Sequence, residues 1–178
     1  HRWDFLRGGT HPDGRRGINF GGNFNNHNVE KLSVTLDLKH AAGRVAFLRL
    51  VRCADVVMNN LRGDQPQKLG LDYATLGAVN PRILCAHLSA YGRDNERKGW
   101  PGYDYLMQAE AGYLSLTGEP DGPPARMGLS IIDLMTGTTA AMGLLAGVIG
   151  ARASGTGRDI DVSLFDVALH NLAYVGTW

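Results

Sequence analysis

The sequence predicts an α/β fold in which helices flank a layer of parallel strands. Apolar strand-like runs at 55–60 and 82–90 alternate with helix-like segments, the order typical of a parallel layer. The composition, 44% hydrophobic and 20% charged, supplies enough apolar surface for a packed interior and argues against disorder. A chain of 178 residues suits one domain, or one domain with part of another.

The elements follow from the spacing of apolar residues and from Gly and Pro breaks. Residues 1–30 are rich in Gly, Asn, His and Arg and predict a loop-rich segment, whereas 31–178 predicts the large α/β domain. Arg44, Arg49 and Arg52 would form the solvated face of the first helix. Strands are expected at 31–38, 55–60, 82–90 and 158–162, and helices at 41–55, 66–76, 102–114, 134–152 and 164–178.

The charge balance and the cysteines exclude several classes of protein. A net charge of +1 gives no overall field for nucleic acid or an anionic membrane. Cys53 and Cys85 form no metal-type cluster and are expected to be buried, reduced thiols. No secretion signal opens the sequence, so a cytoplasmic protein is expected. Neither end carries a complete element, which predicts a piece of a longer chain.

The segment Leu134–Ala151 has no charged residue over a length that approaches a membrane span. Threonines and four glycines dilute its hydropathy, so the sequence predicts a core helix covered on every side. Glycine costs roughly 1 kcal/mol against alanine inside a helix, and close backbone packing is the expected compensation.

Ligands of parallel sheets collect at the carboxyl ends of the strands, here 59–62 and 89–93. In these loops and the helix that follows the first of them, Asn60, Arg62 and Lys68 supply donors for phosphate or amide groups. No glycine-rich phosphate motif follows a strand, so neither a dinucleotide site nor a P-loop has direct support.

One carboxylate, Asp133, lies between apolar neighbours in the stretch Gly128–Gly137, where the uncharged helix would begin. Aspartate is a common helix N-cap, and this is its commonest role at such a position. The same placement suits a desolvated carboxylate nucleophile acting on an activated substrate such as a thioester. Tyr103 and Asp104, at the start of another helix, have the same two interpretations.

Eight strings occur in order from Asn26 to the C-terminus: Asn26–Lys39, Ala54–Arg62, Leu69–Asp72, Asn80–Leu84, Gly102–Asp104, Leu116–Gly118, Asp133–Gly137 and Ser154–Arg158. Their order is more specific than any one of them. Together they resemble the family III CoA-transferases, the formyl-CoA and carnitine CoA-transferase group.

The resemblance implies an enzyme that moves CoA between an acyl-CoA and a carboxylic acid. It implies that Asp133 forms an acyl-aspartyl anhydride and then an aspartyl-CoA thioester, with Tyr103 and Asp104 beside the thioester. Coenzyme A would be a substrate and not a resident cofactor, and no metal is implied. The implied CoA-binding residues are Leu36, Asp37, Leu38, Lys39, Asn60, Leu61, Arg62 and Lys68.

The family resemblance also implies a Rossmann-like sheet within an interlocked homodimer. Members of the family are about twice as long, so an N-terminal strand and a C-terminal linker with a small domain are expected to be missing. Tyr103 stands where related racemases have histidine, which favours a transferase, and Gly63-Asp64 replaces the usual Pro-Gly. An α-methylacyl-CoA racemase-like enzyme and a CoA-binding fragment without turnover stay open as alternatives.

Overall fold

The computed structural model describes residues 4–177, which divide into two compact units at Thr35/Leu36. The first unit holds a short 3-10 helix η1 (Phe5–Arg7), the antiparallel strands β1 (Gly8–Thr10) and β2 (Arg16–Ile18), and helix α1 (Gly22–His27). The prediction of a loop over 1–30 is therefore wrong in part. Strands this short show no periodicity, and Gly9 lets one of them approach the Phe20 backbone too closely for any Cβ.

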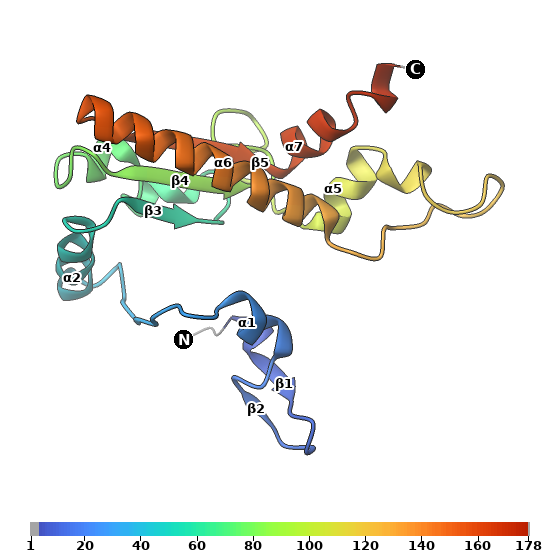
Figure 1. Cartoon of the computed structure of the whole chain (residues 1–178), viewed down its shortest axis with the longest axis horizontal. Helices are drawn as coiled ribbons and strands as arrows, with labels where there is room; N and C mark the ends of the chain where they lie inside the picture. The colour runs from blue at the N-terminus through green and yellow to red at the C-terminus, as the bar shows by residue number, and fades with distance from the viewer. Residues whose placement is uncertain (1–3, 178) are drawn as a thin grey trace. The chain divides into compact units, whose positions relative to one another are not determined.

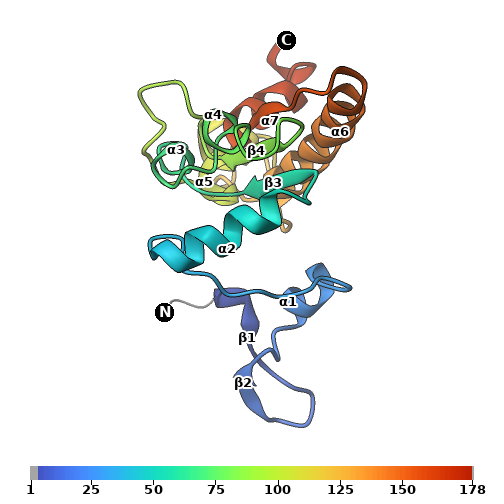
Figure 2. The ribbon, with the colours of Figure 1, turned by 90° about the vertical axis from the view of Figure 1, so that its left-hand side faces the viewer.

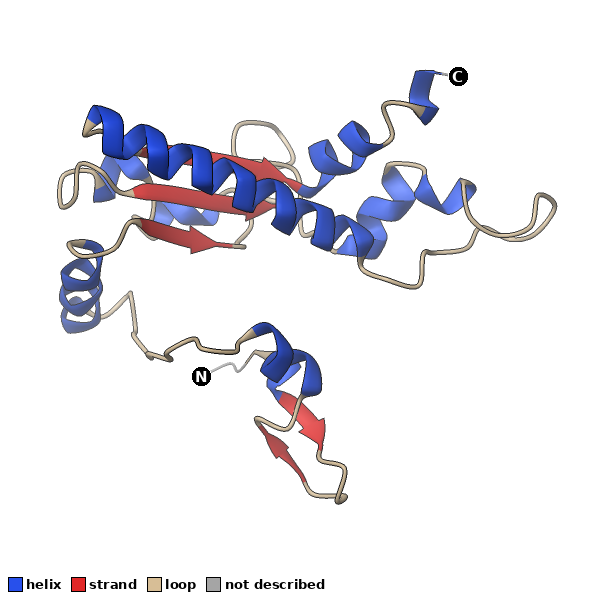
Figure 3. Cartoon of the chain, viewed as in Figure 1, coloured by secondary structure: helices blue, strands red, loops and turns tan. Residues whose placement is uncertain are grey.

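The second unit is built on a three-stranded parallel sheet in the order β3–β4–β5 (Figure 1). The strands are β3 (Val56–Asn59), β4 (Leu84–Ser89) and β5 (Arg158–Ser163), which confirms the strands predicted at 55–60, 82–90 and 158–162. Helices flank this sheet (Figure 3). The α/β fold with a parallel layer is thus confirmed.

The strand predicted at 31–38 is wrong. Residues 31–37 have no strand conformation, and within the described residues no ladder partner pairs with them. Leu32 and Val34 are exposed. Alternating polarity marks a segment that could lie on a sheet. Without a neighbouring strand, however, its backbone N–H and C=O groups have no strand to pair with, and no sheet forms.

Helices α2 (Ala41–Val51) and α4 (Tyr73–Leu76) pack against one face of the sheet, and the short helix α3 (Gln65–Lys68) precedes α4 along the chain. Their core contains Val51, Leu76, Ile83 and Cys85. The helix predicted over 66–76 is split, because Gly70 adopts a φ of +59° and the Asp72 side chain caps a new helix. Cys85 is buried as predicted, but Cys53 is exposed in the turn that follows α2.

The opposite face carries α6 (Ile131–Ser154), as the end-on view in Figure 2 shows with α3 on the other side of the sheet. A Cβ on Gly147 would lie 2.8 Å from the side chains of Leu84 and Ile160, so this glycine brings α6 close to the sheet. The predicted close packing is confirmed at Gly147, whereas Gly137 and Gly150 have nothing within 4 Å of such a Cβ.

Three further segments extend from the carboxyl end of the sheet. They are α5 (Asp104–Glu110) with the 3-10 turn η2 (Tyr113–Ser115), α7 (Leu164–Asn171) and the 3-10 turn η3 (Val175–Thr177). The helices predicted at 102–114 and 164–178 are therefore real but shorter. Met107, Ile132 and Ala168 join α5, α6 and α7 in one buried cluster.

The outer side of α6 is open. Leu134, Met142, Leu145 and Ile149 are spaced along one stripe and are all more than half exposed. The prediction of a helix covered on every side is wrong for this chain, because the sheet lies on one side only. By length and composition alone, α6 is also the one helix among residues 4–177 that could cross a membrane.

Candidate functional site

Asp133 is the third residue of α6 and lies at the carboxyl edge of the sheet. Gly147 faces Leu84, the first residue of β4, whereas Met135 and Ala140 belong to the cluster with Leu88 and Val162 near the strand ends. The helix therefore runs antiparallel to the strands. The loop that follows β3 begins at the same edge, as expected for ligand sites of parallel sheets.

The cap of α6 comes from Asp104, the first residue of α5. Its buried carboxylate accepts hydrogen bonds through Oδ1 from the backbone N–H groups of Ile132 (2.7 Å) and Asp133 (3.0 Å). Ser130 is the residue before the helix, and its side chain makes no capping bond. The interpretation of Asp133 as its own helix cap is therefore wrong, and its carboxylate is not used for capping.

Gln108 holds the Asp104 carboxylate in place from one turn along α5. Its Nε2 donates to Asp104 Oδ2 (2.5 Å) and to the carbonyl oxygen of Leu129 (3.2 Å). Its Oε1 accepts from the backbone N–H of Met127 (2.9 Å). This fully buried amide thus links α5 to the loop that leads into α6. Sequence reasoning missed it, although its spacing of four residues from Asp104 on one helix was a usable signal.

The pKa of Asp133 is raised above its ordinary value, first because partial burial removes water from the carboxylate and second because the charge of Asp104 lies nearby. A carboxylate nucleophile must lose hydrating water before it attacks, so this environment suits a reacting group. The flanking Ile132 is completely buried. The helix N-terminus favours negative charge and keeps the side chain suited to an ionised role.

Tyr103 lies just before α5 and is 72% exposed, and its hydroxyl makes no helix-capping hydrogen bond. Asp104 beside it is 4% exposed. Gly102 fixes the start of α5 against the end of β4, because any Cβ there would collide with the Ala90 side chain. Of the predicted pair, Asp104 is therefore joined to Asp133 by a hydrogen bond, whereas Tyr103 faces solvent.

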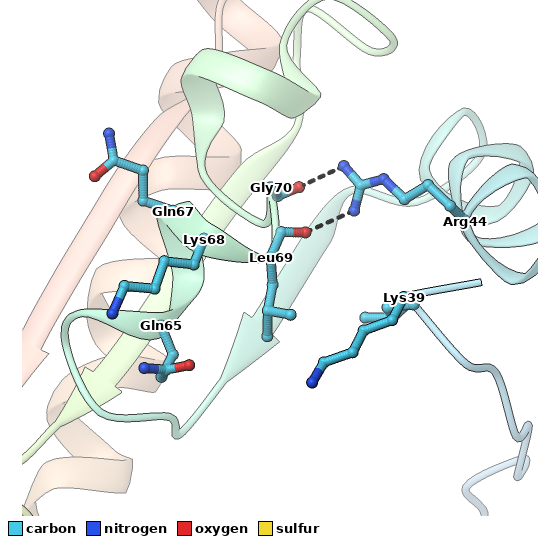
Figure 4. Close-up of a pocket in the computed structure, with 8 residues that line it drawn as sticks. Lys39, Arg44, Gln65, Gln67, Lys68, Leu69 and Gly70 are labelled. Atoms are coloured by element: carbon cyan, nitrogen blue, oxygen red, sulfur yellow. Dashed lines mark hydrogen bonds between the residues drawn. The ribbon is translucent and has the colours of Figure 1, made fainter. Parts of the chain in front are cut away.

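A pocket of about 730 Å³ lies between the segment before α2 and helix α3 (Figure 4). The predicted CoA-binding residues Leu38, Lys39 and Lys68 line it. Leu36, Asp37, Asn60, Leu61 and Arg62 are not among its lining residues. Its other walls are Arg44, Gln65, Gln67, Leu69 and Gly70.

Arg44 shapes this pocket, although the sequence placed it on a solvated face. Its guanidinium donates to the carbonyl oxygens of Leu69 and Gly70, both at 2.8 Å, as Figure 4 shows. These acceptors are 25 and 26 residues away, so no local pattern could reveal them. Arg44 therefore ties α2 to the end of α3 and holds the two sides of the pocket together.

Lys68 forms an ion pair with Asp64 at 2.6 Å, and Arg62 approaches the same carboxylate at 3.4 Å. The hydrogen bond from Lys68 is the main cause that holds the pKa of Asp64 below its ordinary value. In the described part of the chain Lys39 makes no ion pair. The Lys68 ammonium group is thus paired with a carboxylate, whereas the Lys39 ammonium group is available to bind an anion.

His87, on β4, is buried and is held by two polar side chains. Its Nε2 lies 3.0 Å from Asp159 Oδ1 and its Nδ1 lies 2.9 Å from Asn59 Nδ2, so both ring nitrogens have partners. Over residues 4–177, no three His, Cys, Asp or Glu side chains gather as a metal site would require.

The model of the family described as CoA-transferase family III matches residues 4–178. This chain belongs to CoA-transferase family III. It is 42% identical over 149 residues to an acyl-CoA transferase of Fusarium pseudograminearum, covering 84% of this chain. It is 39% identical over 140 residues to a succinate–glutarate CoA-transferase of Agrobacterium fabrum, covering 79% of this chain.

A solved structure shares the fold of this family III chain. A CAIB/BAIF family protein from Brucella suis superposes with a TM-score of 0.82 and 30% sequence identity, covering 94% of this chain and 48% of that one. The chain spans about a third of the length of the two curated relatives, 33% and 35% respectively.

Proposed function

We propose that the protein containing this chain transfers CoA from an acyl-CoA to a carboxylic acid, with Asp133 as the nucleophile. The observation that carries the proposal is the environment of the Asp133 carboxylate. Its carboxylate makes no hydrogen bond among residues 4–177, is partly desolvated, and lies at the carboxyl edge of the sheet, while Asp104 takes over the capping of its helix. Membership of CoA-transferase family III supports the reaction class.

The chemistry follows from a carboxylate meeting a thioester. An Asp133 oxygen attacks the acyl carbonyl, the C–S bond breaks, and a mixed anhydride forms with release of the CoA thiolate. The thiolate attacks the aspartyl carbonyl of the anhydride, which gives an aspartyl-CoA thioester and frees the donor acid. The acceptor carboxylate repeats these two steps in reverse, so CoA leaves on the acceptor and Asp133 is regenerated.

The pocket bounded by Lys39 and Lys68 is the proposed site for the nucleotide part of CoA. Two ammonium groups offer charge to its phosphates, and the amides of Gln65 and Gln67 offer donors and acceptors. CoA enters this scheme as a substrate. No group in the scheme requires a resident cofactor.

The acceptor class proposed for this site is a short dicarboxylic acid. The relative from Agrobacterium fabrum is named for succinate and glutarate, which are both diacids, and 39% identity extends over most of this chain. We further propose a homodimer for the full-length protein, which the exposed apolar stripe on α6 supports because such stripes are usually covered in an assembly.

The test uses the full-length protein. After incubation with succinyl-CoA and then hydroxylamine, peptide mass spectrometry is expected to find a hydroxamate on Asp133, and Asp133→Asn is expected to show neither the adduct nor CoA transfer. An unmodified Asp133 peptide during active turnover would exclude the aspartyl route. Deuterium uptake at the substrate α-carbon without CoA transfer would instead indicate the racemase alternative.

A further inference from the structure

Arg126 lies in the loop that leads into α6, and its guanidinium stacks on an aromatic ring. The guanidinium carbon lies 4.3 Å from the centroid of Tyr105, the residue that follows Asp104 on α5. Within residues 4–177 Arg126 makes no ion pair and no hydrogen bond. The side chain is therefore oriented by an aromatic face, while all five of its N–H donors stay available.

The loop that carries Arg126 is fixed to the site by the Gln108 amide. Gln108 binds Met127 and Leu129 on one side and the Asp104 carboxylate on the other, and Asp104 binds the Asp133 N–H. This path of hydrogen bonds keeps the backbone nitrogens of Met127 and Asp133 within at most about 13 Å of each other. Arg126, one residue before Met127, therefore belongs to a loop that is tied by hydrogen bonds to the first turn of α6, where Asp133 lies.

The charges of the site favour a cation as a partner for a doubly charged substrate. Asp104 and Asp133 already place two carboxylates at the start of α6, and the charge of Asp104 raises the pKa of Asp133. A diacid brings a further carboxylate that takes no part in the reaction and is repelled by both. Arginine offers a planar pair of donors that matches a carboxylate, and one stacked on an aromatic ring loses little freedom on binding.

From this arrangement we propose that Arg126 binds the distal carboxylate of a dicarboxylic substrate while Asp133 reacts at the other end. The proposal rests on the proposed function, since it assumes CoA transfer at Asp133. Arg126 is then the residue that selects diacids over monocarboxylic acids of similar length. Tyr105 is a positioning residue, because it acts by holding the guanidinium.

The experiment compares full-length wild type with Arg126→Met, using succinate and butyrate as acceptors from one acyl-CoA donor. The expected result is a fall in kcat/KM of roughly tenfold to a hundredfold with succinate, the range for losing a charge-assisted pair, and little change with butyrate. Arg126→Lys is expected to recover part of the loss. Tyr105→Leu is expected to raise KM for succinate with a smaller effect on kcat, and Tyr105→Phe to resemble wild type.

One control variant and the Asp133 adduct assay separate the possible failures. Arg158→Met removes another exposed arginine and is expected to leave both acceptors unaffected. Equal losses with succinate and butyrate, or no loss with either, would overturn the role of Arg126 while the Asp133 adduct still supports CoA transfer. Absence of both transfer and the adduct in wild type would mean that the proposed function itself fails.

Discussion

The Asp104 carboxylate accepts a hydrogen bond from the backbone N–H of Asp133 at 3.0 Å. Two acidic residues thereby meet at the first turn of α6 with different tasks. The buried Asp104 caps the helix, whereas the carboxylate of Asp133 makes no hydrogen bond among residues 4–177. Because a single aspartate cannot fully serve as both cap and nucleophile, this division leaves Asp133 available for chemistry.

The first prediction concerns the charge that Asp104 places near Asp133. Asp104→Asn removes a cause that raises the pKa of Asp133, so that pKa should fall part of the way toward its ordinary value, since burial is the larger cause and stays. The acid limb of the pH profile for single-turnover adduct formation is expected to move to lower pH. An unmoved limb would show that Asp104 does not act on Asp133 through charge.

Asp104→Ala provides the comparison, because it removes the cap as well as the charge. The two N–H groups at the start of α6 would lose their acceptor, which costs roughly 0.5–2 kcal/mol in the free energy of unfolding. Urea denaturation of both variants measures this difference. Asp104→Asn, which keeps an oxygen acceptor, is expected to lose less stability than Asp104→Ala.

The second prediction is that Asp133 makes the fold less stable at neutral pH. Its pKa is higher in the folded state than in the unfolded state, so the folded state binds more protons and stability falls as pH rises from the unfolded pKa through the folded pKa. Asp133→Asn should therefore have a higher Tm than wild type at pH 7, and the gain should vanish in acid, below the ordinary carboxyl pKa of about 4. A lower Tm for the variant at pH 7 would contradict the raised pKa.

The third prediction concerns Gln108, which is completely buried and bonded through both ends of its amide. Gln108→Leu would leave the Met127 N–H and one Asp104 oxygen without partners, at a cost of about 1–3 kcal/mol in the free energy of unfolding. Gln108→Glu keeps the shape but sets a second carboxyl group against Asp104. It should destabilise the protein more at pH 8 than at pH 5, measured by urea midpoints at both values.

The fourth prediction tests the pocket beside α3. Lys39→Met and Lys68→Met are each expected to raise KM for acyl-CoA severalfold to about tenfold with little change in kcat, as loss of a phosphate contact would. The Lys39 variant should have the larger effect, because Lys68 already forms an ion pair with Asp64. Lys98→Met removes a lysine outside the pocket lining and should behave as wild type.

Much of the parallel layer could be predicted from the sequence. The runs that became β3 and β4 are short, mainly apolar and end in polar residues, and a parallel strand carries this pattern within itself. The run that became β5 alternates charged residues with Ile160 and Val162 and follows the glycines that end α6. Residues 31–38 show an alternating pattern just as clearly but form no strand. A strand also needs a neighbour to pair with, and its own residues cannot reveal whether one is there.

The sequence by itself determined the α/β class, the parallel strands, and the long helix that begins beside Asp133, because these depend on patterns within one segment. Only the tertiary structure decided that Asp104 caps that helix, since its acceptor oxygen lies 28 residues before Ile132. The same holds for Arg44, whose acceptors lie on the far side of the pocket. Contacts between distant segments arise from the packing of the sheet and its helices, and local spacing does not encode them.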